Sequence, residues 1–568
     1  MIGPILDLAV TGYTERGSRL VVIDRRETAG GAPYLDVCDV AYEQRPTDRR
    51  SITKLTVADG VARLVPTASA DGVRWADAAH LVIAGGLLSL RMRPGASLRW
   101  HHPPSPAGEV LSWAVNGKGV DVRQEAGCVQ ICSTTNDLTV RWCRPGLDRD
   151  LQSVDHDVLA CAAADSWRAW MAKAPRVAER WQDVVDRSWW QLAANIVRLD
   201  RAPEQELVVP SKLGYVGAWQ WDSYFIAVGL RHGDPELAAE QIRFFLDHQQ
   251  PSGFIPDVVH DSGQISSVAD LPESERDFSA RVLRRAVTSP ELRAIPVTKP
   301  PLASWAADLV REAGGPDLIA ERGEQLDRLR EWWLARPSPD GLPGFEHPYS
   351  SGFDDSPLFD DGAPVYAPDL PAYLVVEADV LAAAARRAGD EASAVDHVRR
   401  AEQLTASLIE SRWDAGRRLF RVLTPMGASA PRTPIDLLPL LTGRLPEEIA
   451  AALVADLADP DLFATPWPVP TVACGETPFD ADRMWRGPVW VNINWLLVQG
   501  LRRSGRAGQA RVLAERTLEL AARTPGCFEY YRSDTGAAAS GAVAGFGWTA
   551  ALLVDLAVWL TSERGGLP

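Results

Sequence analysis

The chain has 568 residues, too many for one core of ordinary size, so its length favours two domains over one. Its 59 lysines and arginines stand against 75 aspartates and glutamates, and the net charge of −16 argues against nucleic acid or an anionic membrane as a partner. A small neutral or polar ligand fits this charge better.

The seven cysteines are odd in number, scattered and without paired CxxC spacing. They indicate neither a disulfide framework nor a zinc site, and we expect reduced thiols that lie mostly in the core. The N-terminus lacks the basic segment and apolar stretch of a signal peptide, and no apolar run reaches the roughly 20 residues that span a bilayer. These features predict a cytoplasmic protein.

From the N-terminus to about residue 150, the hydrophobic residues recur with a period of two. Short runs such as SRLVVIDRR and HLVIAGGLLSLRMR are rich in β-branched and aliphatic residues and are separated by Gly, Asp, Asn and Pro. This pattern predicts an antiparallel β-sandwich, which we assign to a domain of residues 1–155.

After about residue 160 the period becomes that of α-helices, with apolar residues at i, i+3, i+4 and i+7. Roughly twelve helical segments follow Arg176, the first of them RVAERWQDVVDRSWWQLAANIVRLD. The even number suggests helical hairpins, and short connectors at 231–235 and 503–506 predict antiparallel neighbours. Residues 156–568 are therefore predicted to form a mainly α domain.

Three stretches of this region are longer than ordinary connectors and rich in Gly, Pro and Asp, namely 251–298, 337–368 and 459–485. If the hairpins form a ring, these loops lie near one another, and long loops are where function usually resides. The first stretch is polar enough to be a mobile lid.

Two loop segments carry candidate catalytic carboxylates. SGFDDSP, residues 351–357, sets Asp354 beside Asp355 between a glycine and a proline, although a solvated turn would explain these acids equally well. In CFEYYRSDTG, residues 527–536, Glu529 stands among bulky aromatic residues. Aromatic walls desolvate a carboxylate and raise its pKa toward a value useful for proton transfer.

Two carboxylates on separate loops, facing each other across a pocket, are the minimum equipment for glycoside hydrolysis. One donates a proton to the departing oxygen, and the other activates water or attacks. The positively charged transition state favours an acidic pocket, which would explain why Asp354 and Asp355 are adjacent. Twenty-one tryptophans offer stacking surfaces for sugar rings, although most of them should lie in the core.

Three tryptophan-containing segments stand at apparent helix starts: WQWDSYF (219–225), MWRGPVW (484–490) and GFGWTA (545–550). If the helices alternate up and down, these segments face the same rim as the long loops. Asp222 and Arg486 are then candidates to hold sugar hydroxyls. A buried salt bridge or a helix cap is the alternative explanation of each.

Taken together, five segments resemble glycoside hydrolase family 63, which is related to the trehalases. They are WDSYF, TKPP, SGFDDSP followed by DLPAYL, WRGPVWVNINWLLVQGL, and FEYYRSDTG followed by GFGWTAAL, in the order of the family. That family includes processing α-glucosidases and the bacterial glucosylglycerate and mannosylglycerate hydrolases. The resemblance covers about residue 176 to the C-terminus, and the β-rich half resembles the β-domain of many members in fold type alone.

The resemblance implies an (α/α)6 barrel with a central site that cleaves an α-glycosidic bond with inversion. By motif, Asp354 corresponds to the general acid and Glu529 to the general base. Inversion needs room for a water molecule, so we expect the two carboxyl groups roughly 6.5 to 9.5 Å apart. The substrate-binding residues that we expect are Trp219, Trp221, Asp222, Phe225, Lys299, Gly352, Asp355, Trp485, Arg486, Trp490, Tyr531 and Trp548.

The chain departs from the family pattern at three places. Asp355 stands where an Asn is usual, and Arg532 and Ser533 replace an Asn-Pro pair. Lys299 replaces the common Gln before Pro-Pro. Its ammonium could recognise a carboxylate or phosphate on the leaving group, or it could pair with Asp355, which is the interpretation that we favour.

The sequence therefore predicts an inverting α-glycosidase without a cofactor, acting on a glucose- or mannose-type unit of a small glycoside such as a glycosyl glycerate. Trehalose hydrolysis, a catalytically silent sugar-binding protein and a phosphorylase are the alternatives. The nine histidines show no HExxH or other ligand spacing, and no EF-hand pattern occurs, so we expect no catalytic metal. The sequence does not reveal the oligomeric state.

Overall fold

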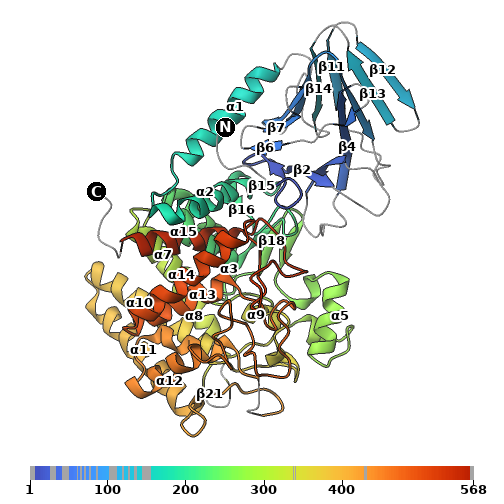
Figure 1. The fold of residues 1–568 in the computed structure, drawn as a ribbon. Helices are drawn as coiled ribbons and strands as arrows, with labels where there is room; N and C mark the ends of the chain where they lie inside the picture. The colour runs from blue at the N-terminus through green and yellow to red at the C-terminus, as the bar shows by residue number, and fades with distance from the viewer. Residues whose placement is uncertain are drawn as a thin grey trace. The chain divides into compact units, whose positions relative to one another are not determined.

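The chain divides into two compact units in the computed structural model (Figure 1). The first comprises Met1–Ala174 and Asp186–Gly217, and the second comprises Pro175–Val185 and Ala218–Pro568. The domain boundary expected at residue 155 stays a prediction. The structure describes residues 7–25, 34–40, 50–59, 62–63, 67–69, 72–75, 78–84, 87–101, 112–117, 120–125, 128–133, 137–143, 155–336, 338, 341–427 and 431–562.

Two antiparallel sheets form most of the first unit, which confirms the predicted antiparallel β region. Across the larger sheet the strands are β1 (Tyr13–Thr14), β2 (Leu20–Arg25), β3 (Tyr34–Asp39), β4 (Arg50–Asp59), β10 (Ala96–His101), β13 (Cys128–Ser133) and β12 (Val120–Glu125), and β5 (Ala62–Arg63) pairs with β4. Across the smaller sheet they are β11 (Ser112–Asn116), β14 (Leu138–Cys143), β9 (Leu87–Met92), β8 (Ala79–Ala84), β7 (Gly72–Trp75) and β6 (Thr67–Ser69).

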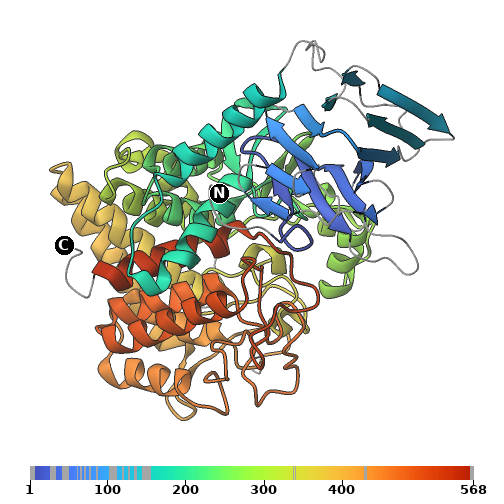
Figure 2. The same cartoon turned by 45° about the horizontal axis from the view of Figure 1, so that its top comes forward.

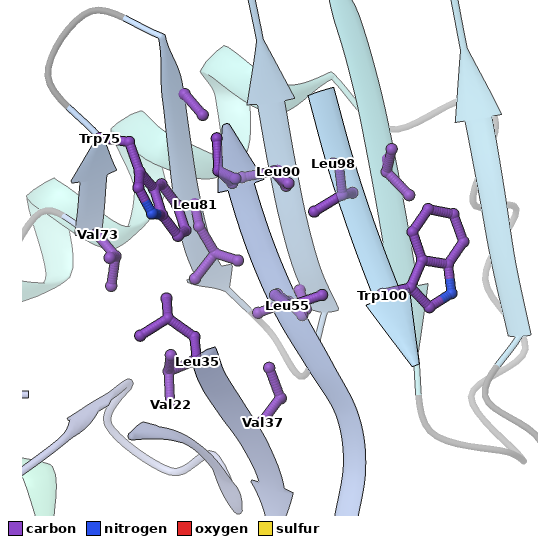
Figure 3. Close-up of a cluster of buried hydrophobic side chains, with 14 of the residues drawn as sticks. Val22, Leu35, Val37, Leu55, Val73, Trp75, Leu81, Leu90, Leu98 and Trp100 are labelled. Carbon is purple, nitrogen blue, oxygen red and sulfur yellow. The ribbon is translucent and has the colours of Figure 1, made fainter. Parts of the chain in front are cut away.

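One hydrophobic cluster takes side chains from both sheets. Figure 3 shows Leu55 and Trp100 of the larger sheet near Leu81 and Leu90 of the smaller one, all of them buried. Trp100 meets the edge of Trp142 with 5.6 Å between the ring centroids. Alternate residues of each strand thus supply a shared core, as period-two patterning requires.

The smaller sheet is covered on its other face by α1 (His156–Met171). Val82 and Leu87 pack with Leu159 of this helix, whereas Leu81 on the same strand as Val82 faces the shared core. All six residues of β8 are buried for this reason, because a strand covered on both faces needs apolar residues in both sets of positions.

The described cysteines are free thiols, as the sequence predicts, but the expectation that most lie in the core is wrong. Among the cysteines whose side chains the structure describes, only Cys38 and Cys527 are buried, and Cys161 is exposed. The first unit also contains α2 in part (Glu179–Ala194) and the hairpin of β15 (Ile196–Leu199) and β16 (Ala202–Val208). The sequence-based assignment of IVRL to a helix is wrong, because these β-branched residues pair with β16 instead.

Six buried helical elements of the second unit form a closed ring; several of them are labelled in Figure 1 and are seen turned by 45° in Figure 2. Each packs against the next, and the last packs against the first. In chain order they are α3 (Gln220–Leu230), α7 (Ala303–Glu312), α10 (Asp369–Arg387), the 3-10 helix η3 (Pro434–Thr442), α13 (Val491–Arg503) and α15 (Gly547–Ser562). A Cβ atom on Gly229 would lie 2.3 Å from the carbonyl oxygen of Ala551, so the ring closes by a close approach of α3 and α15.

Five further helices pack outside this ring, each against the ring element that precedes it in the chain. They are α4 (Pro235–Asp247), α8 (Leu318–Leu334), α11 (Glu391–Arg412), α12 (Glu447–Leu457) and α14 (Ala507–Arg523). The connectors from ring element to outer helix have only three to five residues. This confirms the antiparallel neighbours predicted from the short connectors at 231–235 and 503–506.

The connectors that return to the next ring element are long and hold the remaining short elements. These are β17 (Ala218–Trp219), β18 (Val258–His260), β19 (Gly263–Ile265), η1 (Val268–Asp270), α5 (Glu273–Val282), α6 (Pro290–Arg293), α9 (Pro348–Ser351), η2 (Pro357–Phe359), β20 (Trp413–Asp414) and β21 (Leu419–Phe420). The mobility expected for the stretch 251–298 stays a prediction. Within the described residues, no helix has the length and apolar character needed to cross a membrane.

Candidate active site

All the long connectors of the second unit meet at one end of the ring. The first five ring elements are each followed by a short turn to an outer partner that packs back on them, so the long connectors lead into the N-termini of the ring elements that follow. Asp354 lies in the connector before α10, the third ring element, and Glu529 lies in the connector before α15, the sixth. The third and sixth ring elements are half a turn apart in the ring, and the connectors that precede them bear the two carboxylates.

A tight turn presents the two adjacent aspartates of SGFDDSP. The short helix α9 ends at Gly352, which has a left-handed φ of 80°. A Cβ atom there would lie 2.2 Å from the Trp221 ring, so no larger residue fits without a shift. The N–H of Ser356 then donates to the carbonyl of Phe353 at 3.0 Å, which closes a turn around Asp354 and Asp355.

The two carboxylates of this turn have different partners. Asp354 faces Lys299, whose Nζ lies 3.4 Å from Asp354 Oδ1. Asp355 accepts the backbone N–H of Trp485 at 2.9 Å and pairs with Arg483 at 3.1 Å. The interpretation favoured from the sequence, a pair between Lys299 and Asp355, is therefore wrong: adjacent side chains of a turn diverge, and the lysine lies on the side of Asp354.

Lys299 is surrounded by acids in a nearly closed environment. Its Nζ is also 3.7 Å from Asp257 Oδ1 and donates to the carbonyl of Tyr349 at 2.8 Å. Only 6% of the Lys299 side chain is exposed, against 28% for Asp354. Burial opposes the charged ammonium, but Asp257, Asp354 and Asp222 together raise the pKa of Lys299.

The same burial shifts the acids toward their protonated forms. Desolvation raises the pKa of Asp354 to about 6 and that of Asp257 to about 7, against the opposing charge of Lys299 in both cases. Desolvation likewise raises the pKa of Asp222 well above its ordinary value. A carboxyl group with a pKa near neutrality is suited to donating a proton.

The guanidinium of Arg486 donates its hydrogen bonds to other residues of the protein. Its Nε donates to the carbonyl of Asp355 at 2.9 Å, and its two terminal nitrogens clamp the carboxylate of Asp360. Of the alternatives that the sequence left open, a buried salt bridge comes nearest, although the Asp360 side chain is 54% exposed. Similarly, Arg532 is held by Asp534 and Asp482.

Glu529 is held by its own connector. Its backbone N–H donates to the carbonyl of Val543 at 2.8 Å, and its Oε2 accepts the N–H of Val543 at 3.4 Å. The residue is 4% exposed. Two positions further along, the hydroxyl of the fully buried Tyr531 accepts the N–H of Phe528 at 3.0 Å, which fits a structural part for this tyrosine in the loop.

A chain of aromatic rings joins the two carboxylate-bearing loops. Phe353, beside Asp354, lies 4.6 Å from Trp485, measured between ring centroids. Trp485 stacks on Trp490 at 3.7 Å, and Trp490 stacks on Tyr530, the neighbour of Glu529, at 4.7 Å. Three successive ring contacts therefore connect one candidate catalytic residue to the other.

The remaining aromatic residues expected to bind substrate extend this cluster. Trp548 lies 5.7 Å from Trp221 and 5.6 Å from Trp490, and Phe225 lies 5.4 Å from Trp221. These four rings are almost fully buried, whereas Trp219, just before α3, is partly exposed. Substrate contacts for all of these residues stay predictions.

Sequence reasoning missed several residues that the structure brings to the site. Asp257 and Gln220 position Lys299, and Tyr530 stacks beside Glu529. Asp257 is an acid in one of the long loops, so composition could have marked it as a candidate, but nothing in the sequence pairs it with Lys299. Within the described residues, no group of three or more His, Cys, Asp or Glu side chains is placed to hold a metal ion.

Two surface cavities lie under the 251–298 stretch, with volumes of about 700 and 270 Å³. The larger one includes Trp332 and Arg336, and Pro296 lines both. Neither is lined by Asp354 or Glu529. A hollow between the two carboxylates therefore stays a prediction.

Comparison with known proteins identifies relatives of this chain by sequence. A mannosylglycerate hydrolase of Rubrobacter radiotolerans is 28% identical over 425 residues, which is 62% of this chain and 93% of the relative. A glucosylglycerate hydrolase of Mycolicibacterium hassiacum is 26% identical over 449 residues, which is 65% of this chain and 98% of the relative.

Solved structures show a similar fold. A family 63 mannosylglycerate hydrolase of Thermus thermophilus, solved with glucose, has a TM-score of 0.52 at 23% identity and covers 65% of this chain and 98% of its own. A bacterial glucoamylase solved with acarbose has a TM-score of 0.58 at 11% identity and covers 99% of this chain and 96% of its own.

The sequence model of one family matches residues 215–549, which include Asp354, Glu529 and the aromatic rings between them. That family is described as the mannosylglycerate hydrolase MGH1-like glycoside hydrolase domain. The match spans more than half of the chain and confirms the resemblance seen in the sequence. The protein is a glycoside hydrolase that belongs to this MGH1-like group within glycoside hydrolase family 63.

Proposed function

We propose that this protein is an inverting α-glycosidase that hydrolyses a mannosyl or glucosyl glycerate. The observation that supports the proposal is the series of aromatic contacts that links the loop of Asp354 to the loop of Glu529, two connectors that lead into the helical ring. The proposal includes an (α/α)6 barrel as the fold of the helical part, residues 156–568, a β-sandwich in residues 1–155, and a cytoplasmic location.

Asp354 acts as the general acid. Its carboxyl group is protonated at mildly acidic pH because burial raises its pKa to about 6. Its partial exposure leaves it accessible to a ligand, unlike Asp257 beside it. As the bond from C1 of the sugar to the glycerate oxygen breaks, Asp354 gives its proton to that oxygen.

Glu529 acts as the general base. It takes a proton from a water molecule whose oxygen attacks C1 from the other face of the ring, so the configuration at C1 inverts. The products are free glycerate and the sugar in its β form. This mechanism expects roughly 6.5 to 9.5 Å between the two carboxyl groups, whereas a separation near ~5 Å would favour retention.

The names of the relatives support a glycosyl glycerate as the substrate class. Similarity at 26 to 28% identity extends over nearly the whole length of the mannosylglycerate and glucosylglycerate hydrolases. In this chain Trp219, with a partly exposed ring at the start of α3, is the best placed of the expected aromatic residues to stack on a sugar.

The test is incubation of the purified protein with α-mannosylglycerate, α-glucosylglycerate and trehalose, followed by proton NMR from the first minute. The expected result is release of glycerate with the β anomer of the sugar appearing first. Early appearance of the α anomer would contradict inversion. Cleavage of trehalose but of neither glycerate conjugate would replace the proposed substrate class, and no turnover of any of the three would count against the proposal.

A further inference from the structure

One lysine ammonium lies between two buried or half-buried carboxylates at this site. Lys299 Nζ is 3.4 Å from Asp354 Oδ1 and 3.7 Å from Asp257 Oδ1, so neither acid has the cation to itself. Asp257 is 3% exposed. Its Oδ1 has no hydrogen-bond partner among the described residues, and Lys299 is its ion-pair partner.

The backbone fixes Asp257 and Lys299 with respect to each other. The N–H of Gln220, at the start of α3, donates to the carbonyl of Asp257 at 2.8 Å. The side-chain oxygen of the same Gln220 accepts the N–H of Lys299 at 2.8 Å and the hydroxyl of Thr298 at 2.9 Å. One residue therefore anchors both the acid and the lysine.

Other charged or titratable groups surround this pair from several elements. Glu275 of α5 adds negative charge near Asp257, and Asp355 adds it beside Asp354, whereas burial favours the protonated form of the nearby Asp222 of α3. Tyr349 stays neutral because burial raises its pKa. His347 stays neutral because burial lowers its pKa to about 3. Lys299 is therefore the cation that compensates several buried acids.

Burial raises the pKa of Asp257 to about 7 and that of Asp354 to about 6, so the two acids share one cation and titrate as a pair over the same range. Where Asp257 is ionised, its charge affects the proton affinity of Asp354 in two ways. It attracts the ammonium that would otherwise stabilise ionised Asp354, and it repels a second negative charge in the same buried space. Both effects favour the protonated form of Asp354, which is the form that can donate a proton.

We propose that Asp257 is a positioning residue that shares Lys299 with Asp354 and thereby sets the pH range in which Asp354 can act as the general acid. The proposal rests on the proposed function. It means that Lys299 influences the protonation of the general acid in this chain. The family pattern has a neutral Gln at this position before Pro-Pro.

Two substitutions should move the pH profile in opposite directions. The basic limb of kcat/KM follows ionisation of the general acid in the free enzyme. In Asp257→Asn, Lys299 pairs with Asp354 alone, so the basic limb should shift to lower pH. In Lys299→Gln the cation is lost, so the limb should shift to higher pH by about one unit. Lys299→Arg keeps the charge and should restore the limb toward its original position.

The measurement is kcat/KM for α-mannosylglycerate across mildly acidic to mildly alkaline pH. Asp436→Asn is the matched control, because Asp436 is as buried as Asp257, pairs with Arg432, and has a pKa that burial raises to about 7. It lies outside the Lys299 cluster and should leave the basic limb unmoved. With dinitrophenyl α-mannoside, whose leaving group departs without a proton, none of these variants should shift the basic limb.

The outcomes separate this inference from the proposed function. If Asp354→Asn is inactive on α-mannosylglycerate and both Asp257→Asn and Lys299→Gln shift the limb in the same direction, or not at all, the role of Asp257 is refuted while the assignment of the acid stands. If Asp354→Asn keeps its turnover, the proposed function itself fails. If Asp257→Asn does not fold, Lys299→Gln and Lys299→Arg still show in which direction the charge of Lys299 moves the basic limb of kcat/KM.

Discussion

Two regions of this protein, one in each unit, bury different kinds of side chain. The shared core of the two sheets is built from apolar residues such as Leu55 and Trp100. The helical unit buries Asp222, Asp257 and Lys299 together at the connector end of its ring. Removing charges from water costs free energy that apolar packing would not, so the charged cluster suits chemistry, whereas the core between the sheets contributes stability.

The comparisons with known proteins also differ between the two units. The family match begins at residue 215, close to the start of the helical unit. The fold likeness to a bacterial glucoamylase instead covers 99% of the chain. The helical unit thus carries the family-specific sequence, and the β unit is shared with that glucoamylase at the level of fold.

The largest effect on turnover, with little effect on stability, is expected from Asp354→Asn and Glu529→Gln in the helical unit. Each should lower turnover of α-mannosylglycerate by roughly 10² to 10⁴-fold, the usual contribution of a general acid or base. Because each replacement is nearly isosteric, thermal unfolding followed by circular dichroism should stay close to that of the unchanged protein. Substantial turnover in either variant would remove that residue from the mechanism.

Trp100→Ala in the β unit should lower stability and leave turnover unchanged. This fully buried ring contacts Trp142 in the core of the two sheets, and its removal should cost about 3 to 5 kcal/mol of stability. Urea unfolding measures the loss, and turnover per folded molecule should be unchanged. A variant that folds as well as the original but loses its activity would show that the two units do not divide stability and chemistry in this way.

Gly352→Ala should affect the site through its backbone. The added Cβ would lie 2.2 Å from the ring of Trp221, so the turn that holds Asp354 must shift. Displacing a catalytic group by about 1 Å can cost on the order of 10²-fold in rate. Gly389→Ala is the control, because Gly389 has a similar φ of 76° but no atom within 4 Å of the added Cβ. Steady-state kinetics of both variants should show a large loss in kcat for Gly352→Ala alone.

The smallest effect concerns pH and the one buried histidine pair of the described β unit. His156 Nδ1 lies 2.9 Å from the hydroxyl of Ser89, and its Nε2 lies 3.3 Å from His80. Burial lowers the pKa of His156 from 6.5 to about 4. Its contribution to stability is therefore complete above about pH 6.5 and falls as the pH drops toward 4, by about 1.4 kcal/mol at about pH 5.5. Urea unfolding at about pH 7.5 and about pH 5.5 should show this difference, and His156→Gln should reduce it by about the same amount.

The sequence predicted those parts of the molecule that follow from local periodicity. Period-two runs became the strands of two sheets, and outer helices such as α4 and α14 follow their apolar stripes, whereas α3 and α15 are buried on nearly all sides. The Ile196–Leu199 segment was misassigned because its partner strand β16, rather than local pattern, decides its structure.

Side-chain pairing at the site was harder to predict. The choice of Lys299 between Asp354 and Asp355 depends on the turn closed by Ser356 and on the anchoring by Gln220, and neither is visible as a sequence pattern. Asp257 and Lys299 are brought together by the pairing of β17 with β18, which places Asp257 beside the start of α3. Arg486 was expected to meet a sugar but meets Asp360, a partner distant in the sequence.

The closing contact of the ring has a consequence for synthesis on the ribosome. Gly229 near the beginning of the helical unit packs against Ala551 near its end, and Arg231 pairs with Asp555 at 2.7 Å. The connector bearing Glu529 and the helix that seals the ring leave the exit tunnel last. A nascent chain therefore exposes the apolar faces of α3 and α7 for nearly the whole of the helical unit's translation, and contacts between such distant segments form slowly. Protection of these early helices by a chaperone would matter more here than in a protein whose neighbours in space are neighbours in sequence.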